Sequence, residues 1–116
     1  MLNKRQIGTN KEKIAAEYLK NNGYEILEHN FYASNGEIDI IARESDYLVF
    51  IEVKYRFNDK YGLGYEAVTK KKQMSIYKVA QFYMYKNKIS FDSKVRFDVV
   101  SIDGDNIKIL KNAFMI

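Results

Sequence analysis

Residues 36–56 contain two apolar segments, and each carries charge where the core of a strand would normally have none. The first segment contains Asp39, and the second contains Glu52 and is followed directly by Lys54. Burying a charged side chain costs free energy unless that charge is paired. The three charges must therefore act together, and this requirement constrains the fold of the chain more than any other feature.

A Glu-Ser-Asp turn separates the two segments and favours a β-hairpin. With a four-residue loop over 44–47, Arg43 would pair with Leu48. The same register places Asp39 opposite Glu52. Directly opposed residues point to one face of a sheet, with Cβ atoms about 5 Å apart. The two-residue period of a strand adds the lysine of the second segment to that face. One hairpin thus gathers two carboxylates and an ammonium group.

Two carboxylates at this separation repel each other unless one is protonated or a cation lies between them. The chain has no Cys and one His, so a metal here would be a hard cation bound by oxygen, such as Mg²⁺ or Mn²⁺. Such a cation polarises a phosphoryl oxygen and lowers the pKa of bound water. Lys54 could orient that water or neutralise charge on a phosphate. A structural Asp–Lys–Glu ion-pair network explains the spacing equally well.

The rest of the sequence predicts helices and strands on both sides of this hairpin. The expected elements are a helix over 10–22 ended by Gly23, strands over 24–33, 37–43 and 47–56, a helix over 66–86, and strands over 95–102 and 107–110. The strand over 47–56 is apolar on both faces for most of its length, which is typical of a central strand. Arg96 and Asp98 alternate with apolar residues, and we interpret them as structural. The sequence predicts one α/β domain over 1–116, with a mixed sheet between helices and the order αβββαββ.

Two charged residues fall on the apolar faces of the expected helices. Glu12 lies in register with the apolar stripe of the first helix, although a capping box with Thr9 is a second explanation. Lys72 interrupts the apolar stripe of the second helix, near its start and close to Lys70. Positive charge at that end opposes the helix dipole, and an anionic ligand would relieve the conflict. We interpret Glu12 as a candidate site residue and the two lysines as phosphate contacts.

The charge balance favours a polyanionic partner. The net charge is +4, and taking three carboxylates out of the 15 acidic residues against 19 basic ones leaves +7. Arg56 and the glycine-containing segment 57–65 are expected to face this partner, although a surface salt bridge explains Arg56 as well. No apolar run approaches 18 residues and no signal peptide is apparent, so we expect no membrane association and a cytoplasmic location. The sequence leaves open whether the chain forms a homodimer.

The charged residues of the hairpin carry a resemblance to a known class of enzymes. Asp39, followed by Glu52-Val53-Lys54 on the next strand, resembles the PD-(D/E)XK signature of restriction-endonuclease-like nucleases, with Ile38 at the proline position. The whole chain is similar to the YraN family of small bacterial proteins, which are commonly described as predicted endonucleases. The matching segments are the helix 12–19, Gly23-Tyr24, Gly36–Ala42, Phe50–Arg56, Tyr61-Gly62, Glu66–Gln73 and Arg96–Val100. Archaeal Holliday-junction resolvases are similar in outline, including the interval from Glu12 to Gly23.

The resemblance implies a restriction-endonuclease-like three-layer fold and Mg²⁺- or Mn²⁺-dependent cleavage of DNA, with branched or flapped DNA as a substrate to consider. Asp39, Glu52 and the backbone carbonyl of Val53 would hold the metal against the scissile phosphate. Lys54 would position or activate the attacking water. Glu12 would complete the site through a water on the metal. The alternative is a nucleic-acid-binding module of the same fold that does not cleave.

Overall fold

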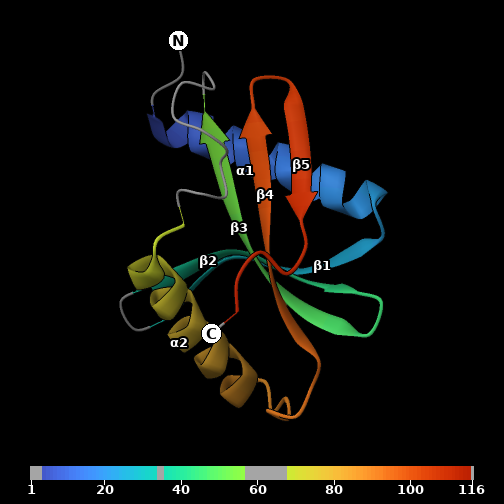
Figure 1. Cartoon of the computed structure of the whole chain (residues 1–116), viewed down its shortest axis with the longest axis vertical. Coiled ribbons are helices and arrows are strands. Elements are labelled where there is room, and N and C mark those ends of the chain that lie inside the picture. Colours follow the sequence, from blue (N-terminus) through green and yellow to red (C-terminus); the bar gives the residue numbers. More distant parts are fainter. Residues whose placement is uncertain (1–3, 34–35, 57–67, 116) are drawn as a thin grey trace.

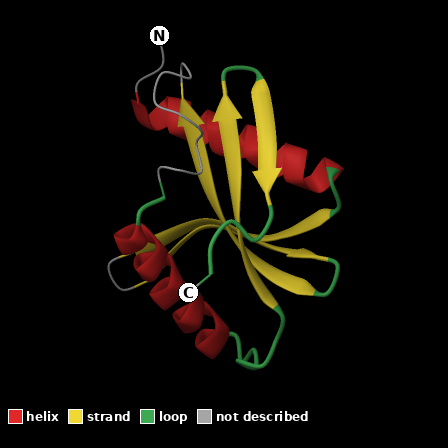
Figure 2. Ribbon diagram, viewed as in Figure 1, coloured by secondary structure: helices red, strands yellow, loops and turns green. Residues whose placement is uncertain are grey.

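A five-stranded mixed sheet forms the centre of the molecule, and one helix lies on each face (Figures 1 and 2). The computed structural model describes residues 4–33, 36–56 and 68–115, and for residues 4–9 and 56 it describes the backbone alone. The elements are α1 (Lys4–Asn21), β1 (Tyr24–Ala33), β2 (Gly36–Glu44), β3 (Tyr47–Arg56), α2 (Lys70–Lys86), β4 (Val95–Asp103) and β5 (Asn106–Leu110). Within the described ranges, this confirms the predicted α/β class and the predicted sequence of helices and strands.

The strands lie in the order β1-β2-β3-β4-β5, so β3 is the central strand, as predicted. The β3–β4 pair is parallel and the other three pairs are antiparallel. A parallel pair cannot be joined by a tight turn, and the connection from β3 to β4 includes α2. This crossover brings the start of α2 back toward the end of β3, where Glu52 and Lys54 lie.

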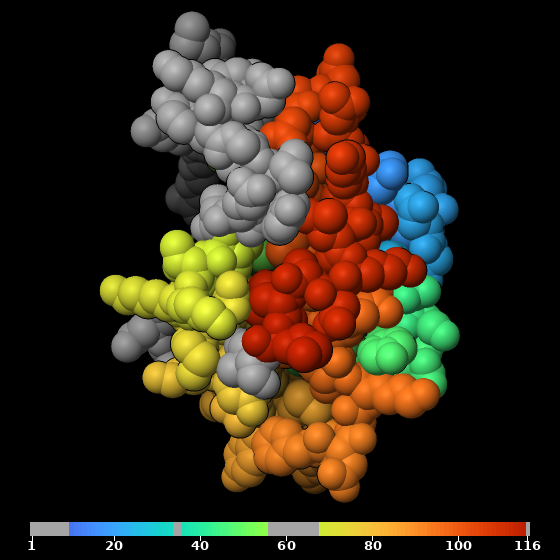
Figure 3. Space-filling view, viewed as in Figure 1, coloured from blue at the N-terminus to red at the C-terminus, as the bar shows by residue number. Residues whose placement is uncertain are grey.

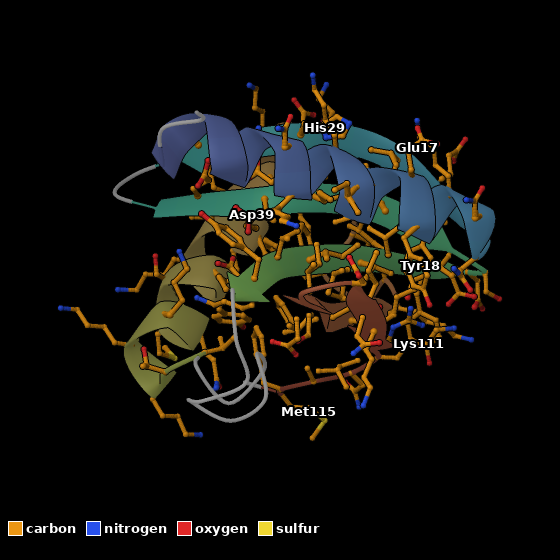
Figure 4. The ribbon with its side chains drawn as sticks, turned by 90° about the horizontal axis from the view of Figure 1, so that it is seen from above. Glu17, Tyr18, His29, Asp39, Lys111 and Met115 are labelled. Atoms are coloured by element: carbon orange, nitrogen blue, oxygen red, sulfur yellow. The ribbon has the colours of Figure 1, made fainter. Side chains whose placement is uncertain are left out.

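Two apolar cores lie on the two faces of the sheet, one under each helix. Alternation along β3 explains the division, because Val49, Ile51 and Val53 pack in the core of α1. Leu48 and Phe50 pack in the core of α2. Figure 4 shows the resulting layers, with α1 above the sheet and α2 below it. Among the described residues, neither helix is long and apolar enough to cross a membrane.

The first helix is longer than the sequence predicts. It begins at Lys4 rather than near residue 10, so Thr9 lies inside the helix and is not its N-cap. The capping-box explanation of Glu12 is therefore wrong. The predicted end is confirmed: Gly23 has φ of +91°, and its N–H donates to the carbonyl oxygen of Lys20 at 3.2 Å. Glycine adopts this left-handed conformation without steric cost.

The second helix begins later than predicted. The predicted first residue, Glu66, lies outside the described residues, and Thr69 is the N-cap of a helix that begins at Lys70. The hydroxyl of Thr69 accepts the N–H of Lys72 at 3.1 Å, which satisfies one of the free donors of the first turn. The first turn holds lysines and no acidic residue, so its charge is opposed to the helix dipole.

The turn between β2 and β3 is shorter than predicted, but the register is the predicted one. Glu44 pairs with Tyr47, so the connection has two residues rather than four. Ser45, the first of these, has φ of +57°. Arg43 pairs with Leu48, as predicted. The extra pair next to the turn leaves the predicted register unchanged as far as Ile40 with Ile51, one step before Asp39 and Glu52.

A buried charged network joins β4 to β1, β2 and the C-terminal segment. Asp98 is fully buried, and its carboxylate accepts hydrogen bonds from Arg96, from the hydroxyl of Tyr24 at 2.7 Å and from the N–H of Asn112 at 2.9 Å. Arg96 also contacts a carboxylate oxygen of Glu44 at 3.0 Å. The surrounding donors are matched by acceptors, which confirms the structural interpretation of Arg96 and Asp98.

Candidate metal-binding active site

The two carboxylates singled out by the sequence lie next to each other at one end of the β2–β3 hairpin. Asp39 is 8% exposed and Glu52 is 6% exposed. The regular β2–β3 pairing runs as far as Ile40 with Ile51, one step before the two acids. Beyond that step, an oxygen of Asp39 accepts the backbone N–H of Val53 at 2.8 Å. The carboxylate of Asp39 thus accepts a backbone N–H of β3 beyond the last regular pair of the two strands.

Asp39 lies where the alternation of β2 is interrupted. Ile40 packs in the core of α1, but Ile38, two residues earlier, packs in the core of α2. A regular strand would send both to the same face. Asp39 lies at this break, between the layers of α1 and α2 (Figure 4). It can therefore interact with charges from both helices.

A glycine lets β2 approach α2 closely at the start of this segment. A Cβ atom on Gly36 would lie 2.6 Å from Ser75 Oγ and 2.8 Å from a methyl carbon of Val79. Both distances are shorter than real Cβ contacts, so a larger residue would force the side chains of Ser75 and Val79 to move. The close approach helps to set the first turn of α2 beside the two acids.

Two lysines from different elements approach one oxygen of Glu52. Lys54 Nζ and Lys72 Nζ each lie 3.9 Å from Glu52 Oε1. The other oxygen, Oε2, is buried and has no hydrogen-bond partner in the described part of the chain. Both lysines remain partly exposed. The predicted approach of Lys54 to Glu52 is therefore present. Lys72, predicted only as a phosphate contact, also reaches Glu52, and one buried acceptor stays unsatisfied.

The electrostatics of the pair favour a bound proton when no other cation is near. Burial and, next, the negative charge of Asp39 raise the pKa of Glu52 to about 8, against the opposing effect of the two lysines. Burial also raises the pKa of Asp39, while the hydrogen bond from the Val53 N–H lowers it. Desolvation thus outweighs the ion pairs. When no metal cation is bound, the carboxylate pair therefore keeps a proton at neutral pH.

This shift predicts how the stability of the cation-free protein depends on pH. Below about pH 4.5, Glu52 is protonated in both the folded and the unfolded chain. Between that pH and about 8, the unfolded chain ionises while the folded chain keeps its proton, so the stability contribution present at low pH is lost as pH rises. In a chelating buffer, we expect the melting temperature of the parent to fall relative to that of Glu52→Gln between pH 5 and pH 8. Parallel melting curves over this range would contradict the assignment.

Glu12 reaches the same acids from α1. It is half-buried, and burial together with the charge of Asp39 raises its pKa. A hydrogen bond from Asn30 lowers the pKa, and the charge of Glu37 raises it. Asn30 and Glu37 are site neighbours that the sequence reasoning missed. Glu37 could have been suspected because it is an acid two residues before Asp39, whereas Asn30 carried no signal.

The donor set fits a hard divalent cation held by few protein ligands. In residues 4–33, 36–56 and 68–115, no three His, Asp or Glu side chains are arranged to hold a metal ion by themselves. Mg²⁺ is usually held by one or two carboxylates, with water and substrate phosphate completing its shell. Asp39 and Glu52 meet that description, and the buried, unpartnered Oε2 of Glu52 is an acceptor that a cation would satisfy. The direct roles of Val53 carbonyl and Glu12 toward a metal stay predictions.

The predicted nucleic-acid contacts are described in part. Lys72 lies at Glu52, inside the site, and Lys70 is exposed in the same helical turn. The side chain of Arg56 and the segment 57–65 lie outside the described residues. The lysines of α2 therefore provide positive charge on that side of the carboxylates. The nucleic-acid contacts expected of Arg56 and segment 57–65 stay predictions.

A hollow of about 540 Å³ lies at the other end of the sheet. Its walls come from α2, β4 and the C-terminal segment, including Met84, Phe97 and Phe114. Figure 3 views this face, where the C-terminal segment, in red, lies beside α2, in yellow and orange. Phe97 pairs with Phe50, whereas Glu52 and Lys54 pair with residues farther along β4. The hollow is mostly aromatic and aliphatic, and it is separate from the carboxylates.

Comparison with known proteins places the chain in a family. The model of "Uncharacterised protein family UPF0102" matches residues 11–102, which include Glu12, Asp39, Glu52, Lys54 and Lys72. A UPF0102 protein of Acetivibrio thermocellus is 50% identical over 122 residues, covering 97% of this chain and 93% of the relative. Relatives with the same description from Clostridium botulinum and Lachnoclostridium phytofermentans are 47% and 46% identical, each covering 97% of this chain and 96% of the relative. The chain therefore belongs to the UPF0102 family, the YraN family that its motifs resemble.

Proposed function

We propose that the protein is a Mg²⁺- or Mn²⁺-dependent endonuclease that cleaves DNA, built on a restriction-endonuclease-like form of the three-layer α/β fold. The observation that carries this proposal is the pair of buried carboxylates, Asp39 and Glu52, with an unsatisfied oxygen on Glu52 and two lysines beside it. A protein that only binds nucleic acid needs surface cations and gains nothing from buried acids of like charge.

Each residue of the site has a part in the proposed reaction. A divalent cation, when bound by Asp39 and Glu52, would supply a polarised phosphoryl oxygen and a more acidic water. Lys54 and Lys72 reach Glu52 and stay partly exposed, so their ammonium groups are suited to orient an attacking water and to neutralise charge on the phosphate. Glu12 approaches Asp39 from the α1 layer and is suited to accept a hydrogen bond from water.

Positive charge on the same side supports a DNA substrate. The first turn of α2 carries Lys70, Lys71 and Lys72 without an acidic residue, and the net charge of the chain is +4. Lysines at a helix N-terminus are unfavourable unless an anion lies nearby. A phosphate of the backbone would supply that anion next to the proposed cleavage position.

The proposal is tested with a panel of labelled linear, nicked, flapped and four-way DNAs, incubated with Mg²⁺ or Mn²⁺. We expect nicks that appear with either cation, disappear in a chelator and are absent with Asp39→Asn, and we expect branched or flapped DNA to be cut faster than linear duplex. No cleavage of any DNA, or equal cleavage by Asp39→Asn, would contradict the proposal. Binding without cleavage across the panel would favour a nucleic-acid-binding module that does not cut.

Replacing Lys72 by alanine should weaken DNA binding without changing its sequence preference. Each phosphate neutralised on duplex DNA contributes about −0.9 to the slope of log K against log salt. The slope should therefore flatten by about this amount for Lys72→Ala. The matched control is Lys78→Ala, an exposed lysine farther along the same helix. Fluorescence anisotropy over a salt series measures both slopes, and a Lys72→Ala slope equal to that of the parent would exclude the phosphate contact.

A further inference from the structure

Asn30 occupies an unusual place on the strand next to Asp39. The pairs His29 with Ile40 and Phe31 with Ile38 bracket it, which leaves Asn30 directly across from Asp39. This alignment depends on a register shift earlier in β1, between Ile26 and Glu28. The shift adds one residue to β1. Without it, Asn30 would face Ile38 of β2 instead of Asp39.

The backbone of Asn30 is left-handed, with φ of +50°. Few residues other than glycine adopt this conformation easily, and asparagine is one of them. Asn112, near the C-terminus, has the same conformation, with φ of +54°. The conformation alone therefore explains an asparagine, but it does not explain where the side chain points.

The side-chain amide of Asn30 connects two carboxylates from different elements. Its NH₂ group lies 3.2 Å from both oxygens of Glu12 on α1 and 3.3 Å from an oxygen of Glu37 on β2. The amide is oriented with its nitrogen toward them, because the carbonyl oxygen would otherwise face only acceptors. A neutral donor thus separates two negative groups that flank Asp39.

We propose that Asn30 is a positioning residue of the site, and that its amide holds the carboxylates of Glu12 and Glu37 in fixed places beside Asp39. This inference rests on the proposed nuclease function, because it gives the held carboxylates a role in cation and water binding. Three acids in one place repel one another, and without the amide Glu12 would turn toward solvent. Residues that orient the groups of a metal site typically change metal affinity or activity by about 10- to 100-fold when removed.

The test uses Asn30→Gly, which keeps the left-handed backbone and removes only the amide. We expect the single-turnover cleavage rate to fall about 10- to 100-fold and the Mn²⁺ concentration for half-maximal rate to rise, with the KM for DNA and the melting temperature nearly unchanged. Asn112→Gly makes the same substitution in the same conformation, but beside Asp98 and not at the carboxylate pair, and it should leave all four quantities at the parent values. An Asn30→Gly protein indistinguishable from Asn112→Gly would overturn the proposal.

A second measurement tests the role of Asn30 even if the parent does not cleave DNA. It can therefore contradict the positioning role independently of the proposed nuclease function. In ¹⁵N spectra of the intact protein, the side-chain NH₂ signals of Asn30 should move upfield in Glu12→Gln and in Glu37→Gln, because a charge-assisted hydrogen bond becomes a weaker neutral one. Glu17→Gln, on the exposed side of α1, should leave them in place. Signals that do not respond to either site substitution would show that the amide does not hold these carboxylates, whatever the activity.

Discussion

The Glu52→Gln protein is expected to lose DNA cleavage by about a thousandfold or more and to melt at a higher temperature than the parent in a chelating buffer at pH 8. The loss of activity corresponds to roughly 4 kcal/mol of transition-state stabilisation, which is within the range of a cation that polarises a phosphate. The gain in stability arises because burial and the charge of Asp39 both disfavour an ionised Glu52, and neutral glutamine removes this unfavourable charge. Single-turnover cleavage and thermal melting on the same preparations measure both effects.

A substitution that lowers the cleavage rate but raises the melting temperature identifies a functional acid. Replacing a structural acid would lower the melting temperature instead. If Glu52 belonged to a structural ion-pair network with Lys54 and Lys72, removing its charge would lower the melting temperature. Glu25→Gln, on an exposed position of β1, is the matched control and should change neither quantity. A Glu52→Gln protein that melts earlier than the parent and cuts normally would return the residue to a structural role.

Replacing Asp98 by alanine is expected to have the largest effect on stability. The fully buried carboxylate accepts hydrogen bonds from Arg96, Tyr24 and the N–H of Asn112, and its removal leaves a buried guanidinium with one acid, Glu44, at 3.0 Å. Breaking a buried pair from one side costs about 3–5 kcal/mol. In a domain of this size, the melting temperature should fall by about 10–20 °C.

A surface pair provides the comparison for Asp98. Asp46 and Lys94 make an ion pair of the same length as that of Arg96 and Asp98, 2.8 Å, but both side chains are mostly exposed. Exposed pairs contribute little because water screens them, so Asp46→Asn should hardly move the melting temperature. Equal effects of the two substitutions would mean that burial does not determine the strength of the Asp98 network.

Much of the fold followed from local sequence patterns. The strands Tyr24–Ala33 and Tyr47–Arg56 have the predicted bounds because alternation and turn residues define both ends of each. The pairing of Arg43 with Leu48 was also correct despite the wrong loop length, since adding a pair next to a turn does not change the register. The approach of Lys54 to Glu52 followed from the same alternation, and helical periodicity placed Lys72 on the inward face near the proposed site.

The parts that could not be predicted depend on irregular backbone and on contacts between layers. Asp39 lies at a break in the alternation of β2, which a regular strand pattern does not reveal. Asn30 reaches Glu12 and Glu37 only because β1 shifts register before it. The start of α2 depends on the hydroxyl of Thr69, one weak cap among several possible positions. The first two features arise from tertiary packing that overrides local preference, and the third from a choice among local caps.

The sharpest test of the proposed metal site is the position of a bound cation. We expect anomalous scattering from a crystal of the protein grown with Mn²⁺ at pH 8 to show one strong peak between Asp39 and Glu52, in contact with an oxygen of each carboxylate. A crystal of Glu52→Gln grown in the same way should show no peak there. A parent crystal without Mn²⁺ at this position, or a Glu52→Gln crystal that binds it equally well, would rule out the proposed metal site.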